Sequence, residues 1–116
     1  MIVMNKKRDY TVKDHTFVIC AYKESPFLEE CILSIKEQEV LGHIILATAT
    51  PNEYINALAK KHDIELCVNS KGGGIAKDWN YGVFVAKTKL VTLAHQDDIY
   101  MSNYLKEILN ILNNSK

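Results

Sequence analysis

Four short hydrophobic segments alternate with four segments of helical periodicity along this chain, and this alternation is the strongest organising pattern in the sequence. The hydrophobic segments cover residues 16–21, 43–47, 64–68 and 90–94. Apart from one or two polar positions, each segment is continuously apolar, which is typical of strands in a parallel sheet with helices on both faces. The pattern therefore predicts four strands, each followed by a helix.

The helical segments begin at recognisable start patterns. Ser25 stands before a proline and predicts an N-cap, and Thr50 opens a capping-box pattern with Pro51 at the first helical position. A third helix is expected over about residues 75–86, and Ser102 is expected to cap a fourth. Four β/α units in this order predict an α/β fold with an open, mostly parallel, doubly wound sheet and right-handed crossovers.

The chemistry of such a sheet is expected at one edge. Ligands of open α/β sheets bind beyond the carboxyl ends of the strands, where the strand order reverses. The loops that follow the first and fourth strands, residues 22–24 and 95–98, are therefore the first places to search for a site.

Length and composition fit one globular domain. The chain has 116 residues, within the usual range of about 100 to 150 for a single domain. Residues 1–14 are expected to form a flexible lead-in and residues 15–116 the domain. The 14 basic residues balance the 14 acidic ones, so electrostatics gives no case for binding nucleic acid.

The sequence also bears on cellular location. No segment has the ~20 consecutive apolar residues of a transmembrane helix, and the amino terminus lacks the apolar centre of a secretory signal. Cys20, Cys31 and Cys67 are odd in number and lie in apolar surroundings, as buried thiols in a reducing compartment do. We expect a cytoplasmic location, with a peripheral position at the inner face of the membrane as an alternative.

Asp97 and Asp98 are the most telling pair of polar residues, because they directly follow a buried strand. Two adjacent carboxylates repel one another unless a cation is bound. Sites with few carboxylates suit Mg²⁺ or Mn²⁺, which keep positions open for water and for substrate phosphates. The alternative is that the pair only caps a loop before the last helix. Its place at a strand end favours a metal-assisted phosphate site.

A glycine-rich segment precedes the third helix. Residues 71–74 read Lys-Gly-Gly-Gly, and backbone N–H groups at a helix amino end favour anions. The spacing matches neither the dinucleotide-binding fingerprint nor the P-loop, so a flexible connection is an equal alternative. Lys77 lies one turn into the helix, where it is either a phosphate ligand or an exposed lysine. Trp79 is expected to pack in the core, with stacking on a ligand as the second possibility.

Three segments together resemble a known family. Residues 17–24, the Gly-x(5)-Asn-x-Gly pattern that starts at Gly74, and the acidic loop within residues 90–100 are similar to the amino-terminal half of inverting family 2 glycosyltransferases. The resemblance runs from about residue 16 to 112, and it implies a Rossmann-like sheet of the GT-A type. It further implies that the chain binds a nucleoside-diphosphate sugar, with a UDP-sugar favoured.

The resemblance also implies roles for individual residues. The loop after the first strand would contact the nucleotide base, and the acidic loop would hold the ribose and a Mn²⁺ or Mg²⁺ ion bridging the diphosphate. That metal would act as a Lewis acid for the departing nucleoside diphosphate. The candidate donor-binding residues are Ala21, Tyr22, Glu24, Thr48, Lys77, Gln96 and Asp97, and the candidate metal ligands are Asp97 and Asp98.

The chain departs from the family pattern at three places. The Asp-x-Asp motif reads His95-Gln96-Asp97 and is followed by Asp98, so either aspartate can be the metal ligand. Residues 48–50 lack the acidic residue that often contacts the base after the second strand, which leaves uracil selectivity open. Residues 78 and 79 are Asp-Trp where the family usually has Ala-Arg.

Length is a further departure. The family's acceptor-binding half and its catalytic base lie well beyond the acidic loop, and this chain ends about one helix past it. We therefore expect the donor-binding half of a transferase, with no catalytic base among its residues. The acceptor, a glycan or a lipid-linked molecule, is undetermined. A surface that normally packs on a missing half favours self-association into a homo-oligomer.

Other functions fit the sequence less well. A sugar-phosphate nucleotidyltransferase usually has a Gly-rich, basic loop after the first strand, where residues 22–26 read Tyr-Lys-Glu-Ser-Pro. A receiver-like domain needs an acidic pair there and a phosphorylatable aspartate after the third strand, where residues 69–71 read Asn-Ser-Lys. A catalytically silent nucleotide-binding module retains every feature described and stays the main alternative.

Overall fold

The computed structural model describes residues 9–114. The predicted alternation of strands and helices is confirmed, with a short 3₁₀ helix before the first strand. The elements in chain order are η1 (Val12–Asp14), β1 (His15–Ala21), α1 (Leu28–Lys36), β2 (His43–Thr48), α2 (Glu53–Lys61), β3 (Glu65–Val68), α3 (Ile75–Ala86), β4 (Leu90–His95) and α4 (Tyr104–Asn114).

The four strands form one open, parallel sheet in the order β3-β2-β1-β4. From β1 the chain runs outward to β2 and β3 and then crosses back to place β4 on the other side of β1. The strand order therefore reverses between β1 and β4. In register, Cys20 near the end of β1 pairs with Ala47 of β2 and His95 of β4, so the carboxyl ends of all three strands meet.

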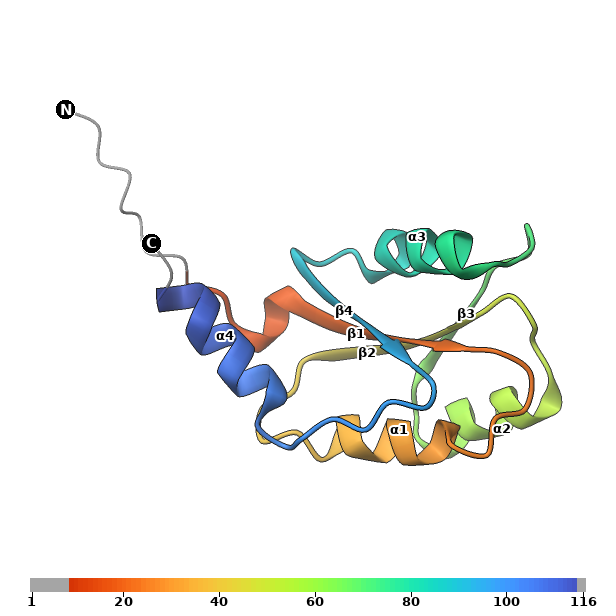
Figure 1. Ribbon diagram of the computed structural model, residues 1–116, viewed down its shortest axis with the longest axis horizontal. Coiled ribbons are helices and arrows are strands. Elements are labelled where there is room, and N and C mark those ends of the chain that lie inside the picture. Colours follow the sequence, from red (N-terminus) through yellow and green to blue (C-terminus); the bar gives the residue numbers. More distant parts are fainter. Residues whose placement is uncertain (1–8, 115–116) are drawn as a thin grey trace.

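Helices cover both faces of the sheet, as predicted. Helix α3 lies alone over one face, while α1 and α2 lie together beneath the other (Figure 1). Helix α4 lies beside one end of the α1 and α2 layer, and its Leu105 and Leu109 join the core of that face. We call the α1, α2 and α4 side the thick face and the α3 side the thin face.

The alternation of side chains along β1 supplies both faces. Phe17 and Ile19 point into the large core of the thick face, where they meet buried residues of α1, α2 and α4. Val18 points to the thin face and meets Ala47 of β2 and Ala86 of α3. All three β1 side chains are fully buried. Burial on both sides of the sheet is the reason that the strand segments are continuously apolar.

Two of the predicted helix starts are wrong by two residues. Helix α1 begins at Leu28, and the Ser25 hydroxyl accepts a hydrogen bond from the Phe27 amide in the turn before it. Helix α2 begins at Glu53 and is capped by Asn52, whose side chain accepts from the Ile55 amide. Thr50 does not cap the helix, because its hydroxyl accepts a hydrogen bond from the Lys23 amide in the loop after β1.

The start of α4 is also different from the prediction. The helix begins at Tyr104, and it is Gln38, at the end of α1, whose side-chain oxygen accepts from the Leu105 amide at 3.0 Å. The Ser102 carbonyl oxygen accepts from the Glu39 amide instead. Gln38 thus accepts from a backbone N–H group at the start of the helix, which has no partner within the helix. Because Gln38 is far from α4 in the sequence, no local pattern predicts this cap.

The segment before β1 contacts the end of the chain. The Tyr10 amide donates to Asn113 Oδ1 at 2.7 Å, and the Asn113 side-chain amide donates to the Tyr10 carbonyl oxygen at 2.9 Å. Thr11 caps η1 through a capping box with Asp14. The predicted lead-in covers residues 1–14, of which residues 1–8 lie outside the described part of the chain.

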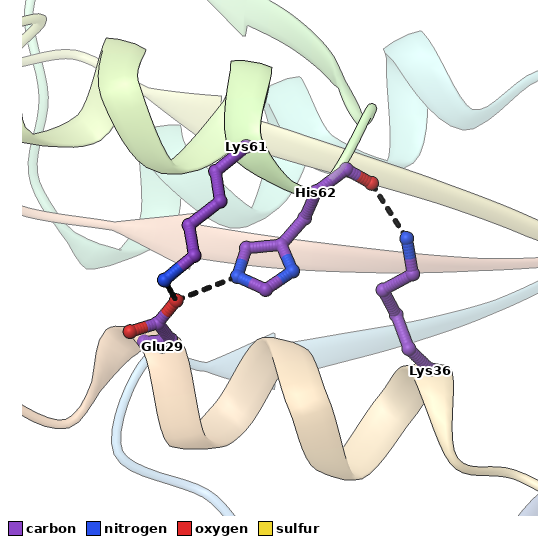
Figure 2. A network of polar contacts seen from close by, with 4 residues as sticks. All are labelled: Glu29, Lys36, Lys61 and His62. Atoms are coloured by element: carbon purple, nitrogen blue, oxygen red, sulfur yellow. Dashed lines mark hydrogen bonds and ion pairs between the residues drawn. The ribbon is translucent and has the colours of Figure 1, made fainter.

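A polar network joins α1 and α2 on the outer side of the thick face (Figure 2). Glu29 of α1 contacts both Lys61 Nζ and His62 Nε2 at 2.7 Å. Lys36, at the other end of α1, donates to the His62 carbonyl oxygen at 2.6 Å. The hydrogen bond from Lys61, followed by that from His62, lowers the pKa of the Glu29 carboxyl. The network lies away from the carboxyl ends of β1 and β4 and fixes the two helices together.

Candidate donor-binding site

An open cavity of about 670 Å³ lies at the carboxyl ends of β1 and β4, beside the amino end of α3. Its size falls within the range of about 300 to 1,000 Å³ that small-molecule sites occupy. This is the edge at which the strand order reverses, as the sequence predicted for a ligand site. The lining residues are Cys20, Tyr22, Ser25, Phe27, Ala49, Thr50, Gly73, Gly74, Ile75, Asp78, Trp79, His95, Gln96 and Asp97.

Gln96 ties the loop after β4 to the loop after β1. Its side-chain oxygen accepts from the Tyr22 amide at 2.9 Å, and its side-chain nitrogen donates to the Tyr22 carbonyl oxygen at 3.2 Å. Both polar atoms of the amide are therefore engaged with the protein backbone. Tyr22 and Gln96 both line the cavity. The Gln96 side chain holds Tyr22 in position, and its amide oxygen and nitrogen are both already hydrogen-bonded to the Tyr22 backbone.

The loop after β1 is also attached to the loop after β2. The Lys23 amide donates to Thr50 Oγ1 at 2.8 Å, and Asn52 donates to the Lys23 carbonyl oxygen at 3.1 Å. Lys23 has a positive φ of 55°, a conformation that these two hydrogen bonds hold in place. The wall that carries Tyr22 is thus fixed from both sides, by Gln96 and by Thr50.

Asp97 and Asp98 have different surroundings. Asp98 turns back on its own loop, where its Oδ2 accepts from the His95 amide at 3.1 Å. Burial, followed by the nearby Asp98 charge, raises the pKa of the Tyr100 hydroxyl, which also forms a side-chain hydrogen bond with Asp98. Asp97 lines the cavity. The geometry separates a carboxylate that stabilises the loop, Asp98, from one that lines the cavity, Asp97.

Asp97 suits a metal ion whose remaining ligands would come from substrate phosphates and water. Within residues 9–114 no group of three or more His, Cys, Asp or Glu side chains is arranged to hold a metal ion. Mg²⁺ and Mn²⁺ need no such cage, because one or two carboxylates together with phosphates and waters suffice. In the described part of the chain, no Lys or Arg lines the cavity, which contains Asp78 and Asp97. A diphosphate would therefore meet net negative charge here unless a cation accompanied it.

The glycine-rich segment forms the opposite wall. Gly73, Gly74 and Ile75 line the cavity at the amino end of α3. Gly74 is the N-cap with a φ of 120°, which an L side chain rarely adopts, and no side chain caps the helix. The amino end of this 12-residue helix thus presents backbone N–H groups without a side-chain acceptor, a favourable place for an anion.

Several predicted site residues lie outside the cavity lining. Lys77 and Glu24 are exposed and do not line the cavity. Ala21 and Thr48 line a small adjoining space, which also contains Cys20 and Asp78. Thr48 is buried, and its hydroxyl accepts from the Thr50 amide at 3.0 Å. Tyr22, Gln96 and Asp97 are the candidates that the fold brings together.

The structure adds cavity residues that were not among the candidate donor-binding residues. Trp79 is 41% exposed and lines the cavity, so the expectation that it packs in the core is wrong. Its ring lies 5.7 Å from that of His95, which also lines the cavity. Phe27 contributes a third aromatic wall and Asp78 a second carboxylate. The Asp-Trp departure from the family's Ala-Arg pattern was the available sign for Asp78 and Trp79.

Cys20 is the only thiol in this cavity among the described residues, and it is unsuited to act as a nucleophile. Burial, followed by the nearby Asp78 charge, raises the pKa of the Cys20 thiol to about 11. A thiol with that pKa stays protonated at neutral pH and lacks the reactive thiolate. The chemistry of the site therefore rests on its carboxylates, its aromatic rings and the backbone of α3.

The fold and the cavity define an open, parallel, Rossmann-like α/β domain with a cavity of small-molecule size at its topological switch point. The family model described as glycosyl transferase family 2 matches residues 16–116. The chain belongs to this family. The resemblance inferred from the sequence motifs is thereby confirmed.

Solved structures support the same fold. A mannosyltransferase, PcManGT from Pyrobaculum calidifontis, in complex with GDP-Man and Mn²⁺, matches 88% of this chain with a TM-score of 0.71 and 16% identity. The S. aureus protein TarS matches 84% of the chain with a TM-score of 0.71 and 13% identity. The chain spans 33% and 19% of the lengths of these two proteins. A search of the curated proteins finds no match.

One finding concerns membranes. Within residues 9–114 no helix is both long enough and apolar enough to cross a bilayer.

Proposed function

We propose that this chain binds a nucleoside-diphosphate sugar through a divalent cation, Mn²⁺ or Mg²⁺, and forms the donor-binding part of a glycosyltransferase. The observation that carries the proposal is the position of Asp97 in a nucleotide-sized cavity that no Lys or Arg side chain of residues 9–114 lines. A diphosphate needs compensating positive charge, and a cation on Asp97 supplies it. The Mn²⁺ and GDP-Man named for the similar mannosyltransferase point in the same direction.

Each wall of the cavity has a part in this proposal. Asp97 holds the cation, and the amino end of α3 at Gly74 donates backbone N–H groups to a phosphate. Tyr22, held by Gln96, and Trp79 offer flat surfaces for the nucleoside. When bound, the metal stabilises the negative charge that develops on the departing nucleoside diphosphate. The protein's residues orient the donor so that its glycosidic bond lies open to an acceptor.

The finer features of the reaction stay predictions from sequence. The acceptor and the catalytic base are expected beyond this chain, and a cytoplasmic address is expected as well. The family resemblance favours a UDP-sugar, but the end of β2 lacks the carboxylate on which that preference rests, so the proposal covers nucleotide sugars as a class. Self-association is expected at the outer side of α3, where Val83 and Phe84 are exposed.

The test is a calorimetric titration of the chain with UDP, GDP, CDP and TDP, each with and without Mn²⁺. We expect Mn²⁺ to strengthen the binding of at least one nucleotide by about tenfold or more, a change that corresponds to about 1.4 kcal/mol. Asp97→Asn is expected to abolish most of that metal dependence, because an amide oxygen carries no charge to hold the cation.

Asp63→Asn is the matched control. Asp63 is exposed after α2 and does not line the cavity, so its substitution should leave nucleotide binding unchanged. Metal-independent binding of every nucleotide would overturn the metal site while leaving the silent nucleotide-binding module as the function. Absence of binding to any nucleotide, in a chain that is folded by circular dichroism, would overturn the proposal altogether.

A further inference from the structure

Asp78 places a carboxylate at the inner side of the cavity, where α3 faces the ends of β1 and β2. It lines both the main cavity and the small adjoining space that Ala21 and Thr48 also line. A Cβ added to Gly73 would lie 3.3 Å from Asp78 Oδ1 and 3.1 Å from the Ala49 Cβ. The carboxylate therefore occupies the corner between Gly73 and Ala49, and the absence of a side chain at Gly73 leaves that corner open.

The Asp78 carboxylate has no protein partner within residues 9–114. No side-chain hydrogen bond and no ion pair involve it, although its backbone amide donates to the Gly74 carbonyl oxygen within α3. By contrast, the Asp98 carboxylate is engaged by the His95 amide. A carboxylate ion accepts up to about four hydrogen bonds. Both Asp78 oxygens are thus available to donors on a ligand.

The walls around this corner suit a flat, aromatic ligand group. Tyr22 and Phe27 are each 53% exposed and Trp79 is 41% exposed, and all three line the cavity. These three side chains open on the same cavity, and apolar groups that gather in this way mark ligand-binding grooves. Aromatic rings that are open to a cavity stack on nucleobases of any kind and give no preference among them. Discrimination must come from a polar group, and Asp78 supplies a carboxylate with both oxygens unengaged within residues 9–114.

Resting on the proposed donor site, we infer that Asp78 reads the base of the nucleotide and selects guanine. Two carboxylate oxygens accept hydrogen bonds from two donors that lie side by side on a planar group. Among the common bases, only guanine presents adjacent N–H donors, at N1 and at the exocyclic N2 amino group. The match is bidentate, and it leaves the ring face free to stack on the aromatic walls.

The other bases fit this carboxylate poorly. Uracil and thymine present one N–H between two carbonyl oxygens, and those oxygens repel a carboxylate that approaches with two acceptors. Cytosine and adenine place a ring-nitrogen acceptor beside the single amino donor. The end of β2 contributes Ala49 and Thr50 to the cavity and no second carboxylate. Base choice in this site therefore depends on one residue of α3.

The experiment compares GDP, IDP and UDP, each with Mn²⁺, by calorimetry on the full chain. Hypoxanthine, the base of IDP, keeps the N1–H of guanine and lacks the N2 amino group. We expect GDP to bind about ten- to a hundredfold more tightly than IDP, the range that one bidentate pair to a base provides. UDP should bind no more tightly than IDP. In Asp78→Asn the preference for GDP over IDP should disappear, because an amide offers one acceptor and one donor.

The controls separate base reading from other roles. Asp63→Asn should retain the full preference, and thermal unfolding should show that Asp78→Asn is folded. A variant that lowers the affinity for GDP, IDP and UDP by the same factor would overturn base reading, because a contact to ribose or a purely structural role acts on all three alike. Equal affinities for GDP and UDP in the native chain would also overturn it and leave the proposed donor site intact. Failure of all three to bind would overturn the donor site itself.

Discussion

The two faces of the sheet differ in depth. On the thick face, Phe17 and Ile19 are fully buried under three helices that contribute large side chains such as Ile32 and Leu105. On the thin face, Val18 shares a small cluster with two other buried residues, Ala47 and Ala86, and partly buried side chains such as Tyr81 and Leu93 pack against it. The single helix on that face, α3, lies over the sheet by itself (Figure 1).

The thin face is the one that carries the candidate site. Helix α3 approaches the sheet closely because Gly82 faces Val18 and Leu93 with no side chain between them. Its outer residues stay open, and Phe84 is 74% exposed. Most of the buried core lies on the thick face. On the thin face, Asp78 and Trp79 of α3 line the cavity and are not part of the core. A shallow core is what allows one helix to serve both as cover and as a wall of the site.

The largest expected effect is on the thick face. Phe17→Ala should lower the free energy of unfolding by about 3 to 5 kcal/mol, the usual cost of removing a buried phenylalanine. The ring lies against Tyr100 and Tyr104, with centroids 5.5 and 5.8 Å away. Its loss therefore leaves a cavity inside the core of the thick face. Urea denaturation at neutral pH measures the change.

Val18→Ala is the matched neighbour, since Val18 is equally buried on the other face of the same strand. It removes two carbon atoms, for which about 0.8 kcal/mol each is expected from burial alone. A loss well above that burial value for Val18→Ala would contradict the shallow core of the thin face, because it would show that a large cavity forms there as well.

A smaller effect is expected for Gly82→Ala. A Cβ at this position would lie 2.9 Å from Leu93 Cδ2 and 3.1 Å from Val18 Cγ1, so α3 must move outward or the two side chains must shift. Overpacking of this kind costs about 1 to 3 kcal/mol, which exceeds the gain of up to about 1 kcal/mol from replacing a helical glycine by alanine. The thermal midpoint should fall, and nucleotide binding should weaken because Asp78 and Trp79 move with the helix.

Leu93→Ala in the same background tests the cause. It removes the Cδ2 atom that an alanine at 82 would approach, so the double variant should lose less stability than the sum of the two single changes. Strict additivity would show that the close approach of α3 and β4 is not the origin of the effect.

The fold was well predicted from the sequence because strands that are buried on both faces have continuously apolar sequences. The continuous apolar segments identified all four strands, and α3 was placed at its observed bounds. The helix starts were less predictable. Ser25 and Thr50 are good local caps, but the Ser25 hydroxyl accepts from the Phe27 amide in the turn before α1, and the Thr50 hydroxyl accepts from the Lys23 amide of another loop. Gln38 caps α4 from 67 residues away, which no local pattern reveals.

The cavity lies where the sequence predicted a site, but its details were less predictable. The adjacent aspartates after a strand directed attention to the edge of the sheet where the cavity lies, but the sequence had no means of separating Asp97 from Asp98. That difference arises from the turn, which brings the His95 amide to Asp98. Gln96 is similar, because its two hydrogen bonds to Tyr22 depend on β1 and β4 being neighbours. Trp79 was expected in the core on the basis of residue type, and only the exposure of α3 shows otherwise.

The smallest expected effect is a pH dependence of folding stability that arises from His15 on the thick face. His15 is buried in β1, where its Nε2 lies 2.7 Å from Thr92 Oγ1 and its Nδ1 has no hydrogen-bond partner within residues 9–114. Burial, with a smaller contribution from His43, lowers the pKa of the imidazole from 6.5 to about 4. The unfolded chain therefore binds a proton more readily than the folded one between these two values. Stability from neutral His15 is complete above pH 6.5 and is lost as the pH falls toward 4.

His15→Gln should remove this contribution while keeping a side chain able to hydrogen-bond Thr92. The free energy of unfolding, measured by urea denaturation at several values between pH 7 and pH 4, should fall less steeply with decreasing pH in the variant than in the native chain. His43→Gln should keep most of the native slope, because burial is the larger cause of the lowered pKa. Identical slopes for native chain and His15→Gln would mean that His15 accepts its proton inside the folded protein. The core of the thick face would then be open enough to hydrate a charge, and the difference in depth between the two faces would be smaller than their side chains indicate.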